Sequence, residues 1–195
     1  MGSSTKLLKE YIKEIVKETR EHKRLRVFDF DDTLVKTDAK VHVTDILGET
    51  FDLTPGEFAV YDKKPGDTFD YTDFHKLINP RAVKWMNKIL RNVYDHHGPN
   101  GLVILSARSS HKPIEQFLRE AGYVGIEVVA LDDATPARKV AWIDERIRRD
   151  DLDMVEFFDD SHKNVAGVKG MQAAHPEVKI ITRHINYTRI ASLHS

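Results

Sequence analysis

The chain has 195 residues with nearly balanced charge, 30 Lys and Arg against 31 Asp and Glu, and a hydrophobic fraction of 41%. This length suits one domain with a sizeable core, and the absence of cysteine excludes disulfides and thiolate chemistry. The near-neutral charge does not indicate general nucleic-acid binding, although it leaves room for a local basic groove. No apolar run approaches the roughly 18 residues of a transmembrane helix, and the charged start does not resemble a signal peptide, so we expect a cytoplasmic protein without membrane partners.

The beginning of the chain has helical periodicity. Six apolar side chains share one face of residues 5–22, and Lys and Glu occupy the other. They are Leu7, Leu8, Tyr11, Ile12, Ile15 and Val16. The pattern predicts an amphipathic helix within residues 1–24, which packs on or extends a single domain over 25–195. A strand is predicted at about 25–30, and residues 187–195 are predicted to be a frayed tail.

Residues 36–79 differ in rhythm from the rest of the chain. Short β-like pieces alternate there with two Pro-Gly pairs, at Pro55 and Pro65. We interpret the segment as a small hairpin-rich flap, inserted after the first strand, with little core of its own. Its aromatic residues can either stack on a nucleic-acid base or form a small core within the flap. These residues are Tyr61, Phe69, Tyr71 and Phe74.

After the flap, helices and strands alternate regularly. The predicted helices cover about 80–94, 113–121, 135–149 and 161–174. The predicted strands cover 101–106, 126–131, 154–158 and 178–183. Continuous apolar strands separated by helices are typical of a parallel sheet that is covered on both faces. The sequence therefore predicts an α/β fold with a doubly wound, five-stranded, Rossmann-like sheet and no large cap.

Polar side chains gather where the predicted strands end. They are Asp29 and Asp31 at the first strand, Ser106 and Arg108 at the second, where Ala107 lies between them, and Asp159 and Asp160 at the fourth. In a doubly wound sheet the carboxyl ends of the strands form the ligand-binding edge. Asp29 and Asp31 are two positions apart, so both can point to the same side. With Asp160 they supply three hard oxygen ligands, which suits Mg²⁺.

Four segments in chain order resemble the motifs of the haloacid dehalogenase superfamily. "DFDDTL", from Asp29 to Leu34, resembles the first motif, and "VILSAR" resembles the second, a strand that ends in Ser or Thr. Lys139 fits the third motif, and "EFFDDSHKN" fits the acidic fourth motif. The likeness runs from Leu25 to about Arg183 and leaves out the N-terminal helix and the flap.

This resemblance implies phosphoryl transfer through an aspartyl-phosphate intermediate. Asp29 would be the nucleophile, and Asp31 would be the general acid and base. By family analogy, an aspartate at the position of Asp31 points to phosphatase or phosphomutase chemistry. Ser106 would donate a hydrogen bond to the transferring phosphoryl group, and Lys139 would offset the negative charge of Asp29 and the phosphate.

The resemblance also implies which residues hold substrate and metal. The expected substrate-binding residues are Thr33, Ala107 and Arg108. The expected Mg²⁺ ligands are Asp29, Asp31 and Asp160. Asn164 stands where the common form of the fourth motif has a second acid, and Asp159 could supply the missing charge. Asp159 is therefore expected either to orient the metal ligands without binding the metal itself, or to replace Asp160 as a ligand.

The lack of room for a large cap bears on the substrate. An open site suits a phosphate at the end of something large, and the chain resembles in style the phosphatase domain of polynucleotide kinase–phosphatase. No phosphate-binding loop of the Gly-x-x-x-x-Gly-Lys-Ser/Thr kind is present in the sequence. We therefore expect a phosphatase acting on nucleic-acid 3′-phosphates or nucleotides. The alternatives are a small-metabolite or phosphoprotein phosphatase and a non-catalytic binding protein of the same fold.

Overall fold

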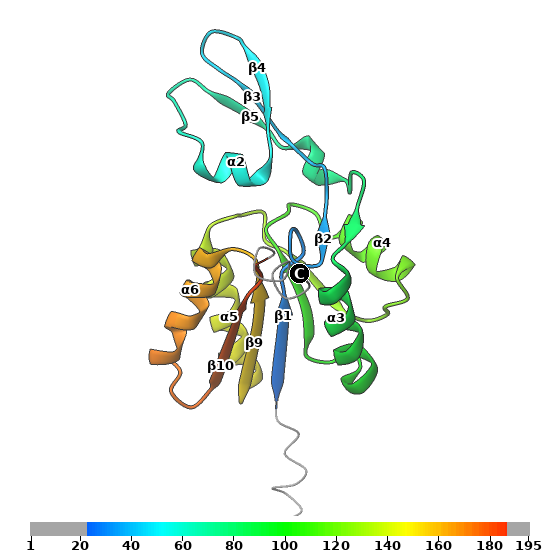
Figure 1. Cartoon of the computed structure of the whole chain (residues 1–195). Helices are drawn as coiled ribbons and strands as arrows, with labels where there is room; N and C mark the ends of the chain where they lie inside the picture. Colours follow the sequence, from blue (N-terminus) through cyan, green and yellow to red (C-terminus); the bar gives the residue numbers. More distant parts are fainter. Residues whose placement is uncertain (1–22, 187–195) are drawn as a thin grey trace, which may run out of the picture.

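The computed structural model describes residues 23–186, so the predicted helix over 5–22 and the predicted tail over 187–195 lie outside the described residues. Its centre is a five-stranded parallel sheet with the order β10-β9-β1-β7-β8 (Figure 1). The strands are β1 (Arg24–Phe28), β7 (Leu102–Ser106), β8 (Glu127–Ala130), β9 (Met154–Asp159) and β10 (Lys179–His184). The predicted α/β class and the five-stranded Rossmann-like sheet are confirmed.

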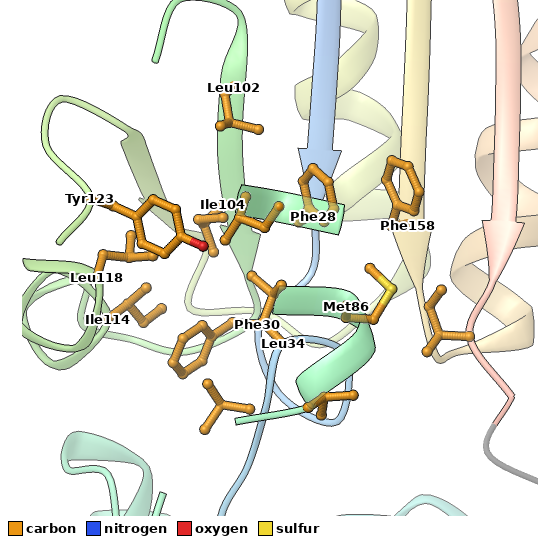
Figure 2. Close-up of a cluster of buried hydrophobic side chains, with 14 residues drawn as sticks. Phe28, Phe30, Leu34, Met86, Leu102, Ile104, Ile114, Leu118, Tyr123 and Phe158 are labelled. Atoms are coloured by element: carbon orange, nitrogen blue, oxygen red, sulfur yellow. The ribbon is translucent and has the colours of Figure 1, made fainter. Parts of the chain in front are cut away.

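Helices cover both faces of this sheet. They are α3 (Lys84–His97) and α4 (Lys112–Glu120) on one face, and α5 (Pro136–Asp150) and α6 (His162–Gly170) on the other (Figure 1). Successive side chains of β1 enter opposite layers, so Phe28 packs toward α3 and Val27 toward α5, and both are fully buried. Figure 2 shows the first layer, where the rings of Phe28 and Phe158 stack with centroids 4.3 Å apart. Within residues 23–186, no helix is both long and apolar enough to cross a membrane.

The strand order fixes where the two halves of the sheet meet. The chain runs from β1 through β7 to β8, then crosses back to place β9 on the other side of β1. The order of the strands therefore reverses at β1. Ligands of open α/β sheets bind at this switch point, outside the carboxyl ends of the strands.

The segment between β1 and α3 forms two smaller antiparallel sheets. Strands β2 (Val35–Lys36) and β6 (Arg81–Ala82) pair as an antiparallel stem. Beyond the stem lies an antiparallel sheet with the order β4-β3-β5, which stands past the carboxyl ends of the parallel strands (Figure 1). Its strands are β3 (Val41–Thr44), β4 (Thr50–Leu53) and β5 (Thr68–Asp70). The short helix α2 (Pro55–Val60) and the 3₁₀ helix η1 (Thr72–His75) complete it. We keep the name flap for residues 36–79.

Aromatic rings pack on one another within the flap. The ring of Phe58 lies 5.3 Å from that of Phe69 and 5.7 Å from that of Tyr71, measured between centroids. Tyr61 contacts Phe69 at 6.3 Å. Of the four aromatic residues whose role the sequence left open, three therefore belong to a small core of the flap. The ring centroid of the fourth, Phe74, lies 5.6 Å from the guanidinium carbon of Arg108.

Three helices depart most from the predictions. The helix predicted from residue 80 begins at Lys84, because the preceding residues pair with β2 and Asn79 has a left-handed backbone, with φ 46°. Helix α2 was not predicted, although Thr54 and Glu57 form a reciprocal capping box at its start. Helix α6 ends at Gly170 and continues as the 3₁₀ helix η2 (Met171–Ala173), short of the predicted end at 174.

Candidate active site

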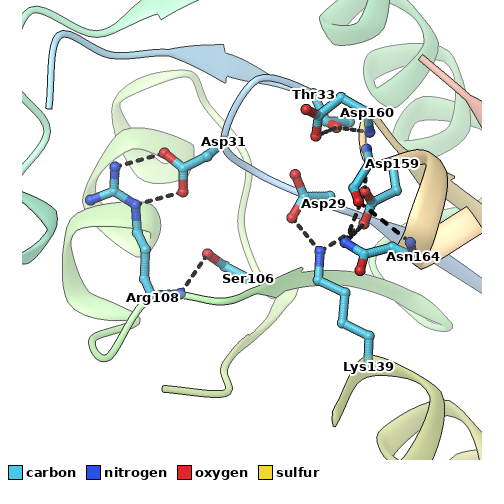
Figure 3. A network of polar contacts seen from close by, with 10 residues as sticks. Asp29, Asp31, Thr33, Ser106, Arg108, Lys139, Asp159, Asp160 and Asn164 are labelled. Atoms are coloured by element: carbon cyan, nitrogen blue, oxygen red, sulfur yellow. Dashed lines mark hydrogen bonds and ion pairs between the residues drawn. The ribbon is translucent and has the colours of Figure 1, made fainter. Parts of the chain in front are cut away.

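Polar side chains from three neighbouring strands and one helix meet at the carboxyl edge of the parallel sheet (Figure 3). Asp29 directly follows β1, Ser106 ends β7, and Asp159 ends β9. Lys139 reaches the same place from the first turn of α5. All four are buried, and Asp159 has no exposed surface. Since burying a charge is costly without a partner, their contacts with one another decide what this site can do.

Lys139 holds two of these carboxylates. Its Nζ donates to Asp29 Oδ1 at 2.6 Å and to Asp159 Oδ2 at 2.7 Å. Asp159 also accepts from the backbone N–H of Ser161 at 2.8 Å and from Asn164 Nδ2, which lies 3.1 Å from each of its oxygens. Both oxygens of Asp159 therefore have at least two donors. Asp159 anchors Lys139 beside Asp29.

The acidic side chains gather closely enough to hold a metal ion. Oxygens of Asp29, Asp159 and Asp160 all lie within 4.8 Å of one another. The structure thus brings together Asp29 and Asp160, as the sequence predicts, but the third member is Asp159 and not Asp31. Three carboxylates against the single ammonium of Lys139 leave an excess of negative charge. Hard oxygen donors with excess negative charge fit a hard divalent cation in both chemistry and charge.

The electrostatics of the site agree with this fit. Burial raises the pKa of Asp29 well above its usual value, and the charges of Asp159 and Asp160 add to this effect while Lys139 opposes it. Burial, together with the charge of Asp159, raises the pKa of Asp160 to about 6. Burial alone would lower the pKa of Lys139, but Asp29 and Asp159 outweigh it and hold that pKa above its usual value. A cation at this edge would favour the ionised carboxylates.

Asp31 lies apart from the acidic group. Its Oδ2 accepts from Arg108 Nε at 2.8 Å, and its Oδ1 accepts from Arg108 Nη2 at 2.7 Å. Figure 3 shows its side chain turned toward Arg108, whereas Asp29 faces Lys139. In the described conformation Asp31 therefore pairs with a bidentate guanidinium and does not join the group of Asp29, Asp159 and Asp160 that could hold a metal ion.

The remaining predicted residues line or support this edge. Thr33 is fully buried, and its Oγ1 accepts from the backbone N–H of Asp160 at 3.1 Å, which ties the loop after β1 to the end of β9. Ser106 is also buried, and its Oγ accepts from the backbone N–H of Arg108 at 3.2 Å. Ala107, between Ser106 and Arg108 in the chain, is half-buried. Contacts of Thr33, Ala107 and Arg108 with substrate stay predictions.

Two residues at the site were not foreseen from the sequence. Asn164 was noted only as the replacement for a second acid, yet its amide holds both oxygens of Asp159. His184, in the last position of β10, places its Nε2 2.8 Å from the carbonyl oxygen of Asp160. The one available signal was position, since His184 ends a strand that the pattern places in the same sheet.

Comparisons of the chain with models of protein families, with curated proteins and with solved structures found no significant match in any of the three. The geometry of the site and the motif resemblance described above are therefore the basis for assigning a function to this chain.

Proposed function

We propose that this chain is a Mg²⁺-dependent phosphatase that hydrolyses phosphomonoesters through an aspartyl-phosphate on Asp29. One observation carries the proposal: the buried Asp29 at the end of the central strand has Lys139 at 2.6 Å and oxygens of Asp159 and Asp160 within 4.8 Å. A carboxylate and a phosphate dianion repel each other. A fixed ammonium and a place for a divalent cation supply the positive charge that lets them approach.

The residues divide the chemistry between two steps. In the first step, an oxygen of Asp29 attacks phosphorus, the bond from phosphorus to the leaving oxygen breaks, and Asp31 donates a proton to that oxygen. In the second step, water attacks the same phosphorus and gives a proton to Asp31, and Asp29 departs as a carboxylate. Lys139 offsets negative charge throughout, and the Ser106 hydroxyl donates to a phosphoryl oxygen. Bound Mg²⁺, held by Asp29 and Asp160, would neutralise charge on the phosphate.

The preferred substrate in this proposal is a phosphate at the end of a large molecule, with nucleic-acid 3′-phosphates as the first choice. The flap has three short strands and a six-residue helix, and only α4 and β8 lie between β7 and α5. Neither insertion has the size of a domain that could enclose a small molecule. Contacts with the rest of a large substrate would then supply the positioning that a closing cap supplies elsewhere.

A phosphatase assay tests the general function. The parent chain should release phosphate from p-nitrophenyl phosphate with Mg²⁺ and not with EDTA. Asp29→Asn should lower turnover by at least about 1,000-fold, because it removes the nucleophile but keeps the shape of the side chain. Acid-quenched parent protein should carry a phosphoryl group on Asp29, detected by mass spectrometry.

The matched control is Asp95→Asn. Asp95 is an exposed aspartate of α3 that forms an ion pair with Arg91 at 3.8 Å, so its loss should not change turnover. Parent-like turnover by Asp29→Asn would contradict the covalent mechanism. Absence of activity toward nucleic-acid, nucleotide, sugar and protein phosphates would favour the non-catalytic alternative.

A further inference from the structure

The guanidinium of Arg108 joins two parts of the molecule. Nε and Nη2 donate to the two oxygens of Asp31, and Nη1 donates to the backbone carbonyls of Phe74 at 2.7 Å and Lys76 at 2.8 Å. Four of the five N–H bonds of the guanidinium are used in this way. The side chain is only 2% exposed. Arg108 therefore links Asp31 to the part of the flap that returns toward β6.

The main chain of Arg108 is fixed to the parallel sheet. Its N–H donates to Ser106 Oγ, and its carbonyl accepts from the N–H of Asp132 at 3.0 Å. The guanidinium at the far end of the side chain lies between Asp31 and the flap. If the carbonyls of Phe74 and Lys76 move, the guanidinium loses the partners that orient it. The orientation of Asp31 then changes as well, because both of its oxygens depend on the same group.

We propose that Arg108 is a positioning residue that couples the placement of the flap to the placement of Asp31. The inference rests on the proposed function, in which Asp31 exchanges a proton with the leaving oxygen. Arg108 holds both oxygens of Asp31 and so fixes the orientation of this carboxyl group, while each oxygen keeps a second position for a hydrogen bond with the leaving group. The flap's return segment, residues 72–78, maintains this orientation, because its carbonyls at Phe74 and Lys76 hold Nη1 of Arg108. A substrate that contacts the flap should therefore raise kcat and not only lower KM.

A direct role of Arg108 in binding the phosphate predicts a different pattern of losses. Replacing a phosphate ligand should impair all phosphomonoesters similarly, whatever their leaving group. Loss of a residue that places the general acid should matter most for an alkoxide leaving group, which needs a proton. It should matter little for p-nitrophenolate, which departs without one. The dependence on the leaving group therefore separates positioning from binding.

The first measurement is the single-turnover rate at which the aspartyl-phosphate forms. Arg108→Gln should lower it by at least about 100-fold on a 3′-phosphorylated oligonucleotide and by less than about 10-fold on p-nitrophenyl phosphate. Asp31→Asn should show the same imbalance, and Arg108→Gln should cost less than about threefold more in that background. Arg108→Lys keeps the charge but not the paired N–H donors of the guanidinium, so its rate should lie between those of Arg108→Gln and the parent. Equal losses on the two substrates would overturn the proposal.

Arg81→Gln is the matched control for this measurement. Arg81 also holds an aspartate with two nitrogens, because Nη1 and Nη2 both donate to Asp38, but it does so in the stem of the flap. Arg81→Gln should leave unchanged the ratio of the rate on the oligonucleotide to the rate on p-nitrophenyl phosphate. A ratio that shifts as much as in Arg108→Gln would show that any loosening of the flap suffices, which would also overturn the specific role of Arg108.

The second measurement does not need activity. Asp31 makes no hydrogen bond or ion pair with residues 72–78 in the described part of the chain. If Arg108 couples them, Asp31→Asn should speed amide hydrogen exchange in 72–78 by at least about fivefold, as Arg108→Gln does. Unchanged exchange in Asp31→Asn would overturn the coupling. If the parent lacks phosphatase activity, the proposed function fails, and this measurement alone decides the coupling.

Discussion

Asp159 and Asp160 are neighbours in the sequence with different surroundings in the fold. Asp159 is fully buried, and its oxygens accept from Lys139, Asn164 and the backbone of Ser161. Asp160 is only partly buried, and its Oδ1 accepts a long hydrogen bond of 3.4 Å from Thr33. These contacts leave Asp160 better able to rearrange around a cation. They favour Asp160 as the metal ligand and Asp159 as the anchor of Lys139.

Replacing Asp160 should stabilise the metal-free protein in a pH-dependent way. Burial and the charge of Asp159 raise the pKa of Asp160 to about 6, so the folded state keeps a proton there that the unfolded chain loses at lower pH. The carboxyl group therefore costs stability that grows as the pH rises from about 4 to about 6. In EDTA, the advantage of Asp160→Asn in the free energy of unfolding should be small at pH 4 and about 3 kcal/mol at pH 7. Urea unfolding of the parent and the variant at the two pH values measures this difference in the free energy of unfolding.

Mg²⁺ provides the control for this prediction. Excess Mg²⁺ should stabilise the parent more than the variant, because the amide is the poorer ligand, and so reduce or reverse the difference. An advantage of the variant that shrinks between pH 4 and pH 7 in EDTA would contradict the assigned direction of the pKa.

Lys139 should contribute to folding as well as to chemistry. Its ammonium is buried between Asp29 and Asp159, which would remain as buried carboxylates without it. Lys139→Met should lower the free energy of unfolding by about 3 kcal/mol, and adding Asp159→Asn should restore part of that loss. The control is Lys88→Met on the exposed side of α3, which should change it by less than about 0.5 kcal/mol. Equal effects of the two methionine variants would contradict the role given to the ion pair.

The flap has its own packing. Neither of the two hydrophobic clusters that cover the faces of the parallel sheet includes a residue between 36 and 76. The flap instead has buried Val41 and Val43 and the ring contacts around Phe58. Segments with few contacts to the main core open locally at a lower free energy than the whole domain. We therefore expect the flap to open without loss of the parallel sheet.

A substitution in α2 tests this independence. Phe58→Ala removes the ring that contacts Phe69 and Tyr71, so amide exchange within 41–75 should become at least about tenfold faster. Exchange in β1 and β9 should not change. The control on the same helix is Val60→Ala, because Val60 is 84% exposed and its loss should alter neither region. Faster exchange in β1 with Phe58→Ala would show that the flap and the sheet unfold together.

Most of the parallel sheet could be predicted from the sequence, because strands that are buried on both faces form continuous apolar runs such as that of β7. The position of the polar residues at one edge follows from the same pattern. The orientation of Asp31 could not be predicted, since its partner Arg108 lies 77 positions away and only the fold decides which group it faces. The predicted start of α3 was wrong, because the pairing of Arg81 and Ala82 with β2 overrides the helix signal of Pro80.

The molecule as a whole should favour a long substrate. We expect kcat/KM on a 3′-phosphorylated oligonucleotide to exceed that on p-nitrophenyl phosphate by at least about 100-fold, or about 3 kcal/mol of transition-state binding. If basic side chains contact the phosphate backbone, the advantage should shrink as salt rises. A nucleoside monophosphate measured in parallel is the control. Equal rates on oligonucleotide and nucleotide would indicate a nucleotidase, and a preference for a sugar phosphate would contradict nucleic acid as the substrate.

The central place of β1 has a consequence for how the protein folds. Strand β1, the first strand of the described residues, lies between two partners, and the second of them, β9, is synthesised about 130 residues later, since Leu25 pairs with Val155. Until then one edge of β1 has no partner in the sheet, and contacts of such high sequence separation form slowly. The same late strand carries Asp159 and Asp160 to Asp29. The mutual repulsion of these carboxylates is thus imposed only when β9 docks on β1, and Mg²⁺ should accelerate that docking.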